Sequence, residues 1–84
     1  MPPSNPQQSR VAVVTGGASG IGEATCHHLA ARGHRVALLD LDGDGAQRVA
    51  KDLRADGSAS LGLAVDVTDR PALDAAFAEI RSTL

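Results

Sequence analysis

The chain has 84 residues, of which 43% are hydrophobic and 21% are charged, and its formal net charge is −2. This length allows one small domain, and the interspersed charges leave no basic stripe that would follow a nucleic-acid backbone. We therefore predict a globular domain with no nucleic-acid partner. Residues 1–9 are polar and proline-rich, so we expect a disordered leader there that is neither a signal peptide nor a membrane anchor.

Cysteine and aromatic residues are scarce. Cys26 is the only cysteine and Phe77 the only aromatic residue. A single cysteine forms no internal disulfide, and its apolar helical neighbourhood favours a core position over a reactive thiol. We therefore expect a cytoplasmic protein that has no membrane partner.

From residue 10 onward, short apolar runs alternate with segments of helical periodicity, which is typical of βαβ units and a parallel sheet. We expect strands over residues 11–14, 36–39 and 61–67. The first two are apolar at every position, so they are predicted to be buried on both faces. The pattern predicts an α/β fold over residues 10–84: the first β-α-β-α-β-α half of a Rossmann-type parallel sheet, truncated at its end.

Each predicted strand is followed by a predicted helix. The first helix is expected to begin near Gly20 and to end at Gly33, which suits a left-handed C-cap. The second covers about residues 44–55 by its three- and four-residue apolar spacing, with Gly57 as its stop. The third begins after Thr68 or Asp69, either of which can cap it. The predicted core-facing residues of the three helices are, in order, Ile21, Ala24, Leu29 and Ala30; Ala46, Val49, Ala50 and Leu53; and Leu73, Ala76, Phe77, Ile80 and Leu84.

The strongest motif is the glycine-rich turn over residues 15–22, between the first strand and the first helix. A diphosphate binds to backbone N–H groups at a helix N-terminus, where a side chain would hold it away. Gly16 permits the turn off the strand, Gly20 lets a pyrophosphate approach the backbone, and Gly22 lets the helix pack closely on the sheet. A strand-to-helix turn without a ligand is the structural alternative. A phosphate loop is excluded because Glu23, and not a Lys-Ser/Thr pair, follows the last glycine.

Asp40 ends the second strand about twenty residues after the glycines, where a carboxylate accepts hydrogen bonds from the adenosine ribose hydroxyls. The same charge repels a 2′-phosphate at close range. This position favours NAD over NADP as the cofactor. The alternative is an aspartate that serves only a loop or a helix cap.

The spacing Thr-Gly-x-x-x-Gly-x-Gly resembles the fingerprint of the short-chain dehydrogenase/reductase family, and the resemblance extends over residues 11–84. It implies that Asp66 and the N–H of Val67 contact adenine, whereas from the residues alone Asp66 could equally cap the coming helix. Leu41 and Ser19 are neutral at positions where NADP-preferring relatives usually carry Arg or Lys. The implied NAD(H)-binding residues are Thr15, Gly16, Ser19, Gly20, Ile21, Gly22, Asp40, Leu41, Asp66 and Val67.

In this family a Tyr and a Lys, assisted by a Ser and an Asn, transfer hydride between the nicotinamide and an alcohol or carbonyl substrate. The 84 residues contain no Tyr, so no catalytic residue is assigned and the isolated chain is expected to be inactive. The resemblance implies an oxidoreductase in which a complete chain binds the substrate and forms homo-oligomers. Two alternatives remain: a stand-alone module that binds NAD or an adenine nucleotide without catalysis, and an inactive truncated product.

Two other patterns suggest metal ligands but do not support a metal site. Residues 40–45 copy the opening of an EF-hand loop, yet position twelve is Lys51 and no helix precedes the segment. His27 and His28 are adjacent on a helix, so their side chains diverge by about 100°. We assign no metal.

In the strand order 3-2-1-4-5-6 the first strand is central and pairs with a fourth strand. The 84 residues provide no fourth strand, so we expect the first strand to be an exposed edge and an apolar area of the first two strands to face water. The isolated chain should therefore be marginally stable or prone to aggregation. Amide hydrogen exchange that is slow and cooperative throughout a monomer would contradict this expectation.

Overall fold

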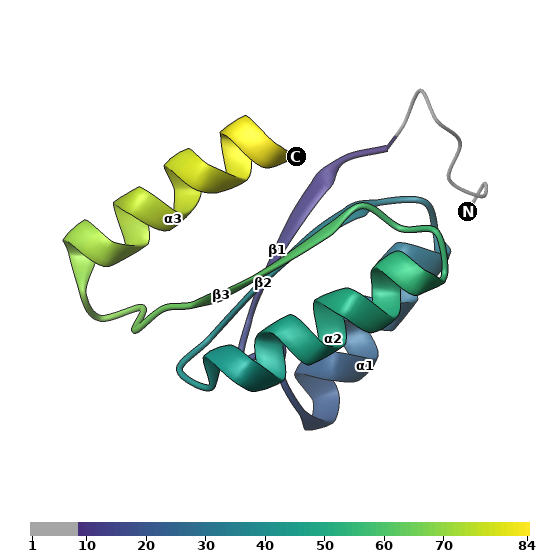
Figure 1. The fold of residues 1–84 in the computed structure, drawn as a ribbon, viewed down its shortest axis with the longest axis horizontal. Helices are drawn as coiled ribbons and strands as arrows, with labels where there is room; N and C mark the ends of the chain where they lie inside the picture. Colours follow the sequence, from purple (N-terminus) through teal and green to yellow (C-terminus); the bar gives the residue numbers. More distant parts are fainter. Residues whose placement is uncertain (1–8) are drawn as a thin grey trace.

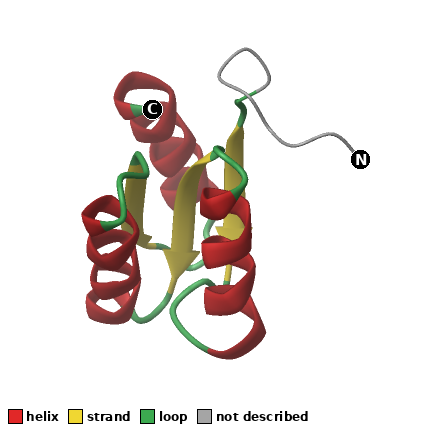
Figure 2. Cartoon of the chain, turned by 90° about the vertical axis from the view of Figure 1, so that its right-hand side faces the viewer, coloured by secondary structure: helices red, strands yellow, loops and turns green. Residues whose placement is uncertain are grey.

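The computed structural model describes residues 9–84, so nearly all of the expected leader lies outside the described residues. Strands β1 (Val11–Thr15), β2 (Arg35–Asp40) and β3 (Ser60–Ala64) alternate with helices α1 (Gly20–Ala31), α2 (Gly43–Ala55) and α3 (Arg70–Thr83). The strands form one parallel sheet in the order β1-β2-β3. Helices α1 and α2 cover one face and α3 covers the other (Figures 1 and 2). The predicted Rossmann-type α/β pattern is confirmed.

Strand β2 lies at the centre of the sheet and is buried on both faces, as predicted. Its side chains alternate between two cores: Val36 and Leu38 pack under α1 and α2, whereas Ala37 and Leu39 pack under α3. All four side chains are fully buried. The strand therefore joins the two layers of helices, and its apolar run is explained by contact with both.

Strand β1 is not buried on both faces, so that prediction was wrong. It lies at the edge of the sheet, and Val11 and Val13 are 37% and 36% exposed. The core under α3 takes its strand residues from β2 and β3, which leaves the α3-side face of β1 uncovered within residues 9–84. The expected exposure of apolar strand surface thus holds for β1 and is wrong for β2.

The predicted core-facing stripe of helix α1 is confirmed for Leu29 and Ala30 and is wrong for Ile21 and Ala24. Ile21 is 86% exposed and Ala24 is exposed, whereas Cys26 is fully buried with Leu29 and Ala30 packed beside it. At about 100° per residue, Ile21 and Ala24 lie roughly 140° and 160° around the helix from Cys26. Cys26 is thus in the core as predicted, and its burial raises the pKa of the thiol.

Helix α2 buries all four residues of its predicted stripe. Asp42 caps its first turn by accepting a hydrogen bond from the Gly45 N–H at 3.0 Å. The helix ends in a left-handed turn at Gly57 (φ 96°), and α1 ends in the same way at Gly33 (φ 89°). Both predicted glycine stops are confirmed.

The third strand and third helix differ from expectation at one place each. Strand β3 ends at Ala64, not at residue 67, because Ala64 pairs with Asp40 and β2 extends no further. Helix α3 buries Ala76 and Ile80, but Phe77 remains 37% exposed and does not join the core. None of the helices in residues 9–84 has the length and apolar composition needed to cross a membrane.

Helix α2 approaches the sheet closely at Gly62 of β3. A Cβ atom at this position would lie 2.4 Å from the carbonyl oxygen of Ala46. We predict that Gly62→Ala lowers the free energy of unfolding by about 1–3 kcal/mol, because the backbone of α2 must move away from the sheet. Urea denaturation measures the loss, and Ala59→Ser, which adds one atom at an exposed position before the same strand, should leave stability nearly unchanged. Equal stability of the two variants would contradict this packing.

Candidate functional site

The carboxyl ends of the three parallel strands meet at one edge of the sheet, where ligands of open α/β sheets bind. A groove of about 390 Å³ lies at this edge. It brings together several of the predicted binding residues with others that sequence reasoning did not assign to the site. The predicted ones are Thr15, Gly16, Asp40, Leu41, Asp66 and Val67, and the additional ones are Leu39, Val65 and Thr68.

The additional lining residues have ordinary structural signals in the sequence. Leu39 and Val65 are buried members of the core under α3, and an apolar residue within a predicted strand gives no sign that it also borders a groove. Thr68 stands out only as a candidate cap. Each is a chain neighbour of a predicted site residue, and this adjacency is the one signal that could have identified them.

The glycine turn leaves β1 through Gly16 and reaches α1 at Gly20. Both have positive φ angles, 70° and 59°, which glycine adopts without the steric cost of a side chain. At both positions, the place that a Cβ would occupy has no neighbouring atom within 4 Å. The backbone here is therefore open to a ligand.

Gly22 is required for a different contact from the one predicted. A Cβ on Gly22 would lie 1.9 Å from the carbonyl oxygen of Gly16, so the close approach is to the turn itself and not to the sheet. Gly17, which the sequence did not single out, faces the core: its Cβ would lie 2.6 Å from Leu38 Cβ and 3.3 Å from Cys26 Sγ. The turn is thus packed tightly on its inner side.

The N-terminus of α1 is the only one of the three described helices without a side-chain cap. Carboxylates of Asp42 and Asp69 cap α2 and α3, whereas Ser19 at the N-cap of α1 makes no side-chain cap bond. First-turn N–H groups have no acceptor within their own helix. Those of α1, including Gly20, Ile21 and Gly22, are therefore available to an anion beside the open glycine turn.

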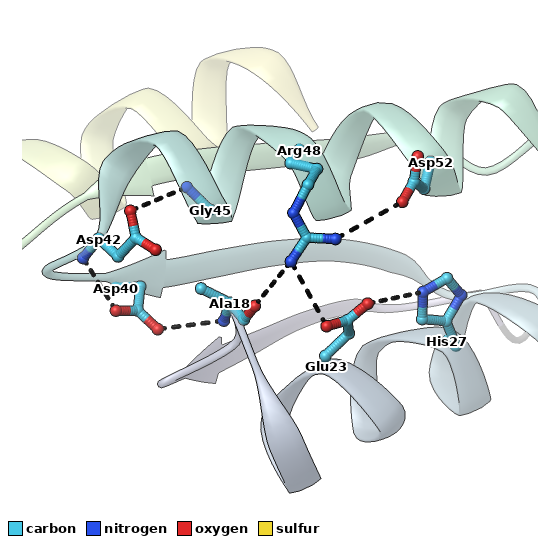
Figure 3. A network of polar contacts seen from close by, with 8 residues as sticks. All are labelled: Ala18, Glu23, His27, Asp40, Asp42, Gly45, Arg48 and Asp52. Carbon is cyan, nitrogen blue, oxygen red and sulfur yellow. Dashed lines mark hydrogen bonds and ion pairs between the residues drawn. The ribbon is translucent and has the colours of Figure 1, made fainter.

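Asp40 ties the glycine turn to the end of β2. Its Oδ2 accepts a hydrogen bond from the Ala18 N–H at 3.0 Å, and its Oδ1 accepts one from the Asp42 N–H at 2.9 Å (Figure 3). The helix that follows is capped by Asp42, so Asp40 is not a helix cap. Each carboxylate oxygen has a second lone pair, so the side chain retains the capacity to accept further hydrogen bonds at the groove.

Asp66 does not cap α3 either, since Asp69 does so through the Ala72 N–H. Instead, Asp66 Oδ1 accepts hydrogen bonds from the backbone N–H and the hydroxyl of Thr68, at 2.9 and 2.6 Å. The Thr68 hydroxyl, followed by its N–H, lowers the pKa of the Asp66 carboxyl below its usual value. This local turn orients the carboxylate at the groove and favours its ionised form.

Comparison with known proteins agrees with this arrangement. The family model described as short chain dehydrogenase matches residues 10–84. The chain belongs to this family. Among solved structures, it is similar to a short chain dehydrogenase/reductase from Burkholderia phymatum in complex with NAD, with a TM-score of 0.85, 31% identity, and coverage of 89% of this chain and 27% of that one. It is also similar to a 3-ketoacyl-(acyl-carrier-protein) reductase from Brucella melitensis complexed with NADH, with a TM-score of 0.81, 36% identity, and coverage of 88% and 29%.

Curated relatives show the same partial coverage. The chain is 45% identical over 67 residues to D-threitol dehydrogenase of Mycolicibacterium smegmatis, which corresponds to 80% of this chain and 26% of the relative. It is 44% identical over 75 residues to carbonyl reductase family member 4 of Danio rerio, covering 89% of this chain and 31% of the relative. The 84 residues therefore correspond to roughly a quarter to a third of these relatives.

The Asp66 turn gives a pH-dependent prediction. Because its pKa is lowered in the folded chain, the Thr68 contacts stabilise the fold above the ordinary carboxyl pKa, and this stabilisation is lost as pH falls through the folded value. We predict that Thr68→Val raises the pKa of Asp66 toward its ordinary value, as followed by carboxyl ¹³C NMR. Thr25→Val is the matched control, since its hydroxyl donates only to the Ile21 carbonyl. An Asp66 pKa that is the same in both variants would contradict the role of the hydroxyl.

Proposed function

We propose that residues 10–84 form the NAD(H)-binding part of a short-chain oxidoreductase. The observation that carries the proposal is the combination, at one edge of the sheet, of an open glycine turn, the uncapped N-terminus of α1, and a groove bordered by Asp40 and Asp66. A dinucleotide has a diphosphate, two riboses and an adenine, and each of these has a chemically suitable partner here.

Different residues suit the diphosphate and the adenosine of a dinucleotide. N–H groups at Gly20, Ile21 and Gly22 suit the diphosphate, because they sit at the positive end of the α1 dipole. Thr15, Gly16 and Ser19 border this anion subsite on the turn. The groove residues at the ends of β2 and β3 would bind the adenosine end of the dinucleotide.

At the adenosine end, Asp40 would accept hydrogen bonds from the ribose hydroxyls with its unused lone pairs. Asp66 Oδ2 is available for the exocyclic amine of adenine, since the bonds from Thr68 go to Oδ1, and the Val67 N–H would donate to a ring nitrogen. Leu41 and Val67 are 76% and 46% exposed. Covering them with an adenine ring would remove apolar surface from water.

Charge at the ribose favours NAD over NADP. The Asp40 carboxylate repels a 2′-phosphate, and neither Leu41 nor Ser19 carries a compensating positive charge. Arg48, which reaches the glycine turn from α2, is already paired with Glu23 and Asp52. The groove therefore offers an acceptor for hydroxyls and no free cation among these residues for a phosphate.

The bound nicotinamide would supply or accept the hydride in the oxidation of an alcohol or the reduction of a carbonyl. The names of D-threitol dehydrogenase and carbonyl reductase family member 4 are consistent with this substrate class. The 84 residues contain no Tyr, so we assign them cofactor binding and assign proton transfer and substrate contacts to other parts of a whole enzyme. We further propose a cytoplasmic, homo-oligomeric enzyme.

Calorimetric titration tests the cofactor assignment. We expect the folded chain to bind NADH more tightly than NADPH, and Asp40→Asn to narrow this preference by roughly tenfold, because the change removes one charge near the 2′ position. The Asn oxygen keeps the hydrogen bond from the Ala18 N–H, while the bond from the Asp42 N–H is lost. Asp42→Asn is the matched control: it removes a charge two residues away and keeps an equally good helix cap.

Two results would count against the proposal. A chain that is folded by circular dichroism and binds neither nucleotide would contradict the dinucleotide site. A wild-type chain that binds NADPH as tightly as NADH would contradict the role given to Asp40 while leaving the site itself in place.

A further inference from the structure

Arg48 lies on α2 and reaches across to the glycine turn and to α1. Its Nη2 donates to the Ala18 carbonyl oxygen at 3.2 Å and lies 3.6 Å from Glu23 Oε1. On the other side, Nη1 lies 4.0 Å from Asp52 Oδ2, one turn further along α2. Figure 3 shows the guanidinium between these three groups. Two carboxylates therefore orient the cation toward a single backbone carbonyl.

Ala18 is held from both sides. Its N–H donates to Asp40 at the end of β2, and its carbonyl accepts from Arg48 on α2. The residue is 4% exposed, yet it lies between Gly16 and Gly20, the two positions of the turn with positive φ. Glycines give a loop more conformational freedom than other residues do. The two hydrogen bonds to Ala18 counteract that freedom at the middle of the turn.

The carbonyl of Ala18 also fixes the next peptide group. A trans peptide is planar, so the Ser19 N–H points opposite to the Ala18 carbonyl. Because Arg48 draws that carbonyl toward α2, the Ser19 N–H is directed away from α2, at the start of the uncapped helix α1. This contact between α2 and the turn thus sets the direction of a donor at the anion subsite.

We propose that Arg48 is a positioning residue for the diphosphate subsite, holding the glycine turn in its binding conformation through the Ala18 carbonyl before a ligand arrives. The inference rests on the proposed function, since it takes the diphosphate of NAD(H) as the ligand of the turn. A turn that is already ordered loses less conformational entropy when a ligand binds, so the affinity for the ligand is higher.

If Arg48 served mainly to stabilise the fold, its removal would lower the unfolding midpoint. The exposure of the side chain argues against such a role. The Arg48 side chain is 55% exposed, and ion pairs at exposed positions contribute little to global stability. Removing the guanidinium should therefore leave the unfolding midpoint almost unchanged and should loosen the turn locally. Local opening, and not global stability, is the property to measure.

The experiment compares Arg48→Gln with Arg54→Gln. Arg54 is a matched control on the same helix, because it donates to a single backbone carbonyl, that of Ser60, at 2.9 Å and away from the turn. In the ligand-free chain, we expect the Ala18 amide hydrogen to exchange roughly three- to tenfold faster in Arg48→Gln, the effect of losing one charge-assisted hydrogen bond. Arg54→Gln should leave this exchange rate unchanged.

Titration with ADP and with adenosine then separates the diphosphate from the nucleoside. We expect Arg48→Gln to weaken ADP binding roughly three- to tenfold and to leave adenosine binding unchanged, because only ADP uses the turn. Arg48→Lys should recover part of the ADP affinity, since an ammonium can donate to the same carbonyl.

The outcomes distinguish this inference from the proposed function. If wild-type chain binds ADP no better than adenosine, the diphosphate site itself is wrong. If wild type prefers ADP but Arg48→Gln binds it equally well, or if the Ala18 amide exchanges at the wild-type rate in this variant, only the role of Arg48 is overturned. Weaker adenosine binding in Arg48→Gln would indicate a general structural role and would also overturn it.

Discussion

The burial of β2 on both faces is the constraint on which the structure depends. One strand supplies side chains to the core under α1 and α2 and to the core under α3. Strand β2 is central, so β3 can pair with it only as far as its last residue. The last pair is Asp40 with Ala64, and β3 ends there. The helices, the sheet edge and the groove are all arranged around the end of this strand.

Asp40 is the last residue of β2, and it places a carboxylate at the groove directly after the buried apolar run. Its carboxylate is the first ionisable side chain after the buried run, and it holds the glycine turn through Ala18 and the start of the α2 connection through Asp42. Arg48 meets the same turn from the opposite side. The turn of a short chain dehydrogenase is therefore supported by residues from two elements that lie 22 and 30 positions further along the chain.

Patterns of apolar spacing and glycine placement were sufficient to predict the element order, the stripe of α2 and the stops at Gly33 and Gly57. Exposure could not be predicted for Val13 or Ile21, because it depends on which helix covers which strand and on how α1 is rotated about its axis. The groove position of Asp40 and Asp66 followed from strand ends. Thr68 stood out only as a candidate cap, because its contact with Asp66 is confined to a two-residue turn. Arg48 had no sequence signal, because the carbonyl that it contacts lies 30 positions earlier in the chain.

The inner side of the glycine turn has a further consequence. Gly17 leaves little room between the turn and the side chains of Leu38 and Cys26, so both of these side chains limit how close to the sheet the turn can lie. The turn therefore has the hydrophobic core on one side and the open backbone of Gly16 and Gly20 on the other. A larger side chain at position 26 would therefore displace the turn as well as crowd the core, even though this thiol is itself fully buried.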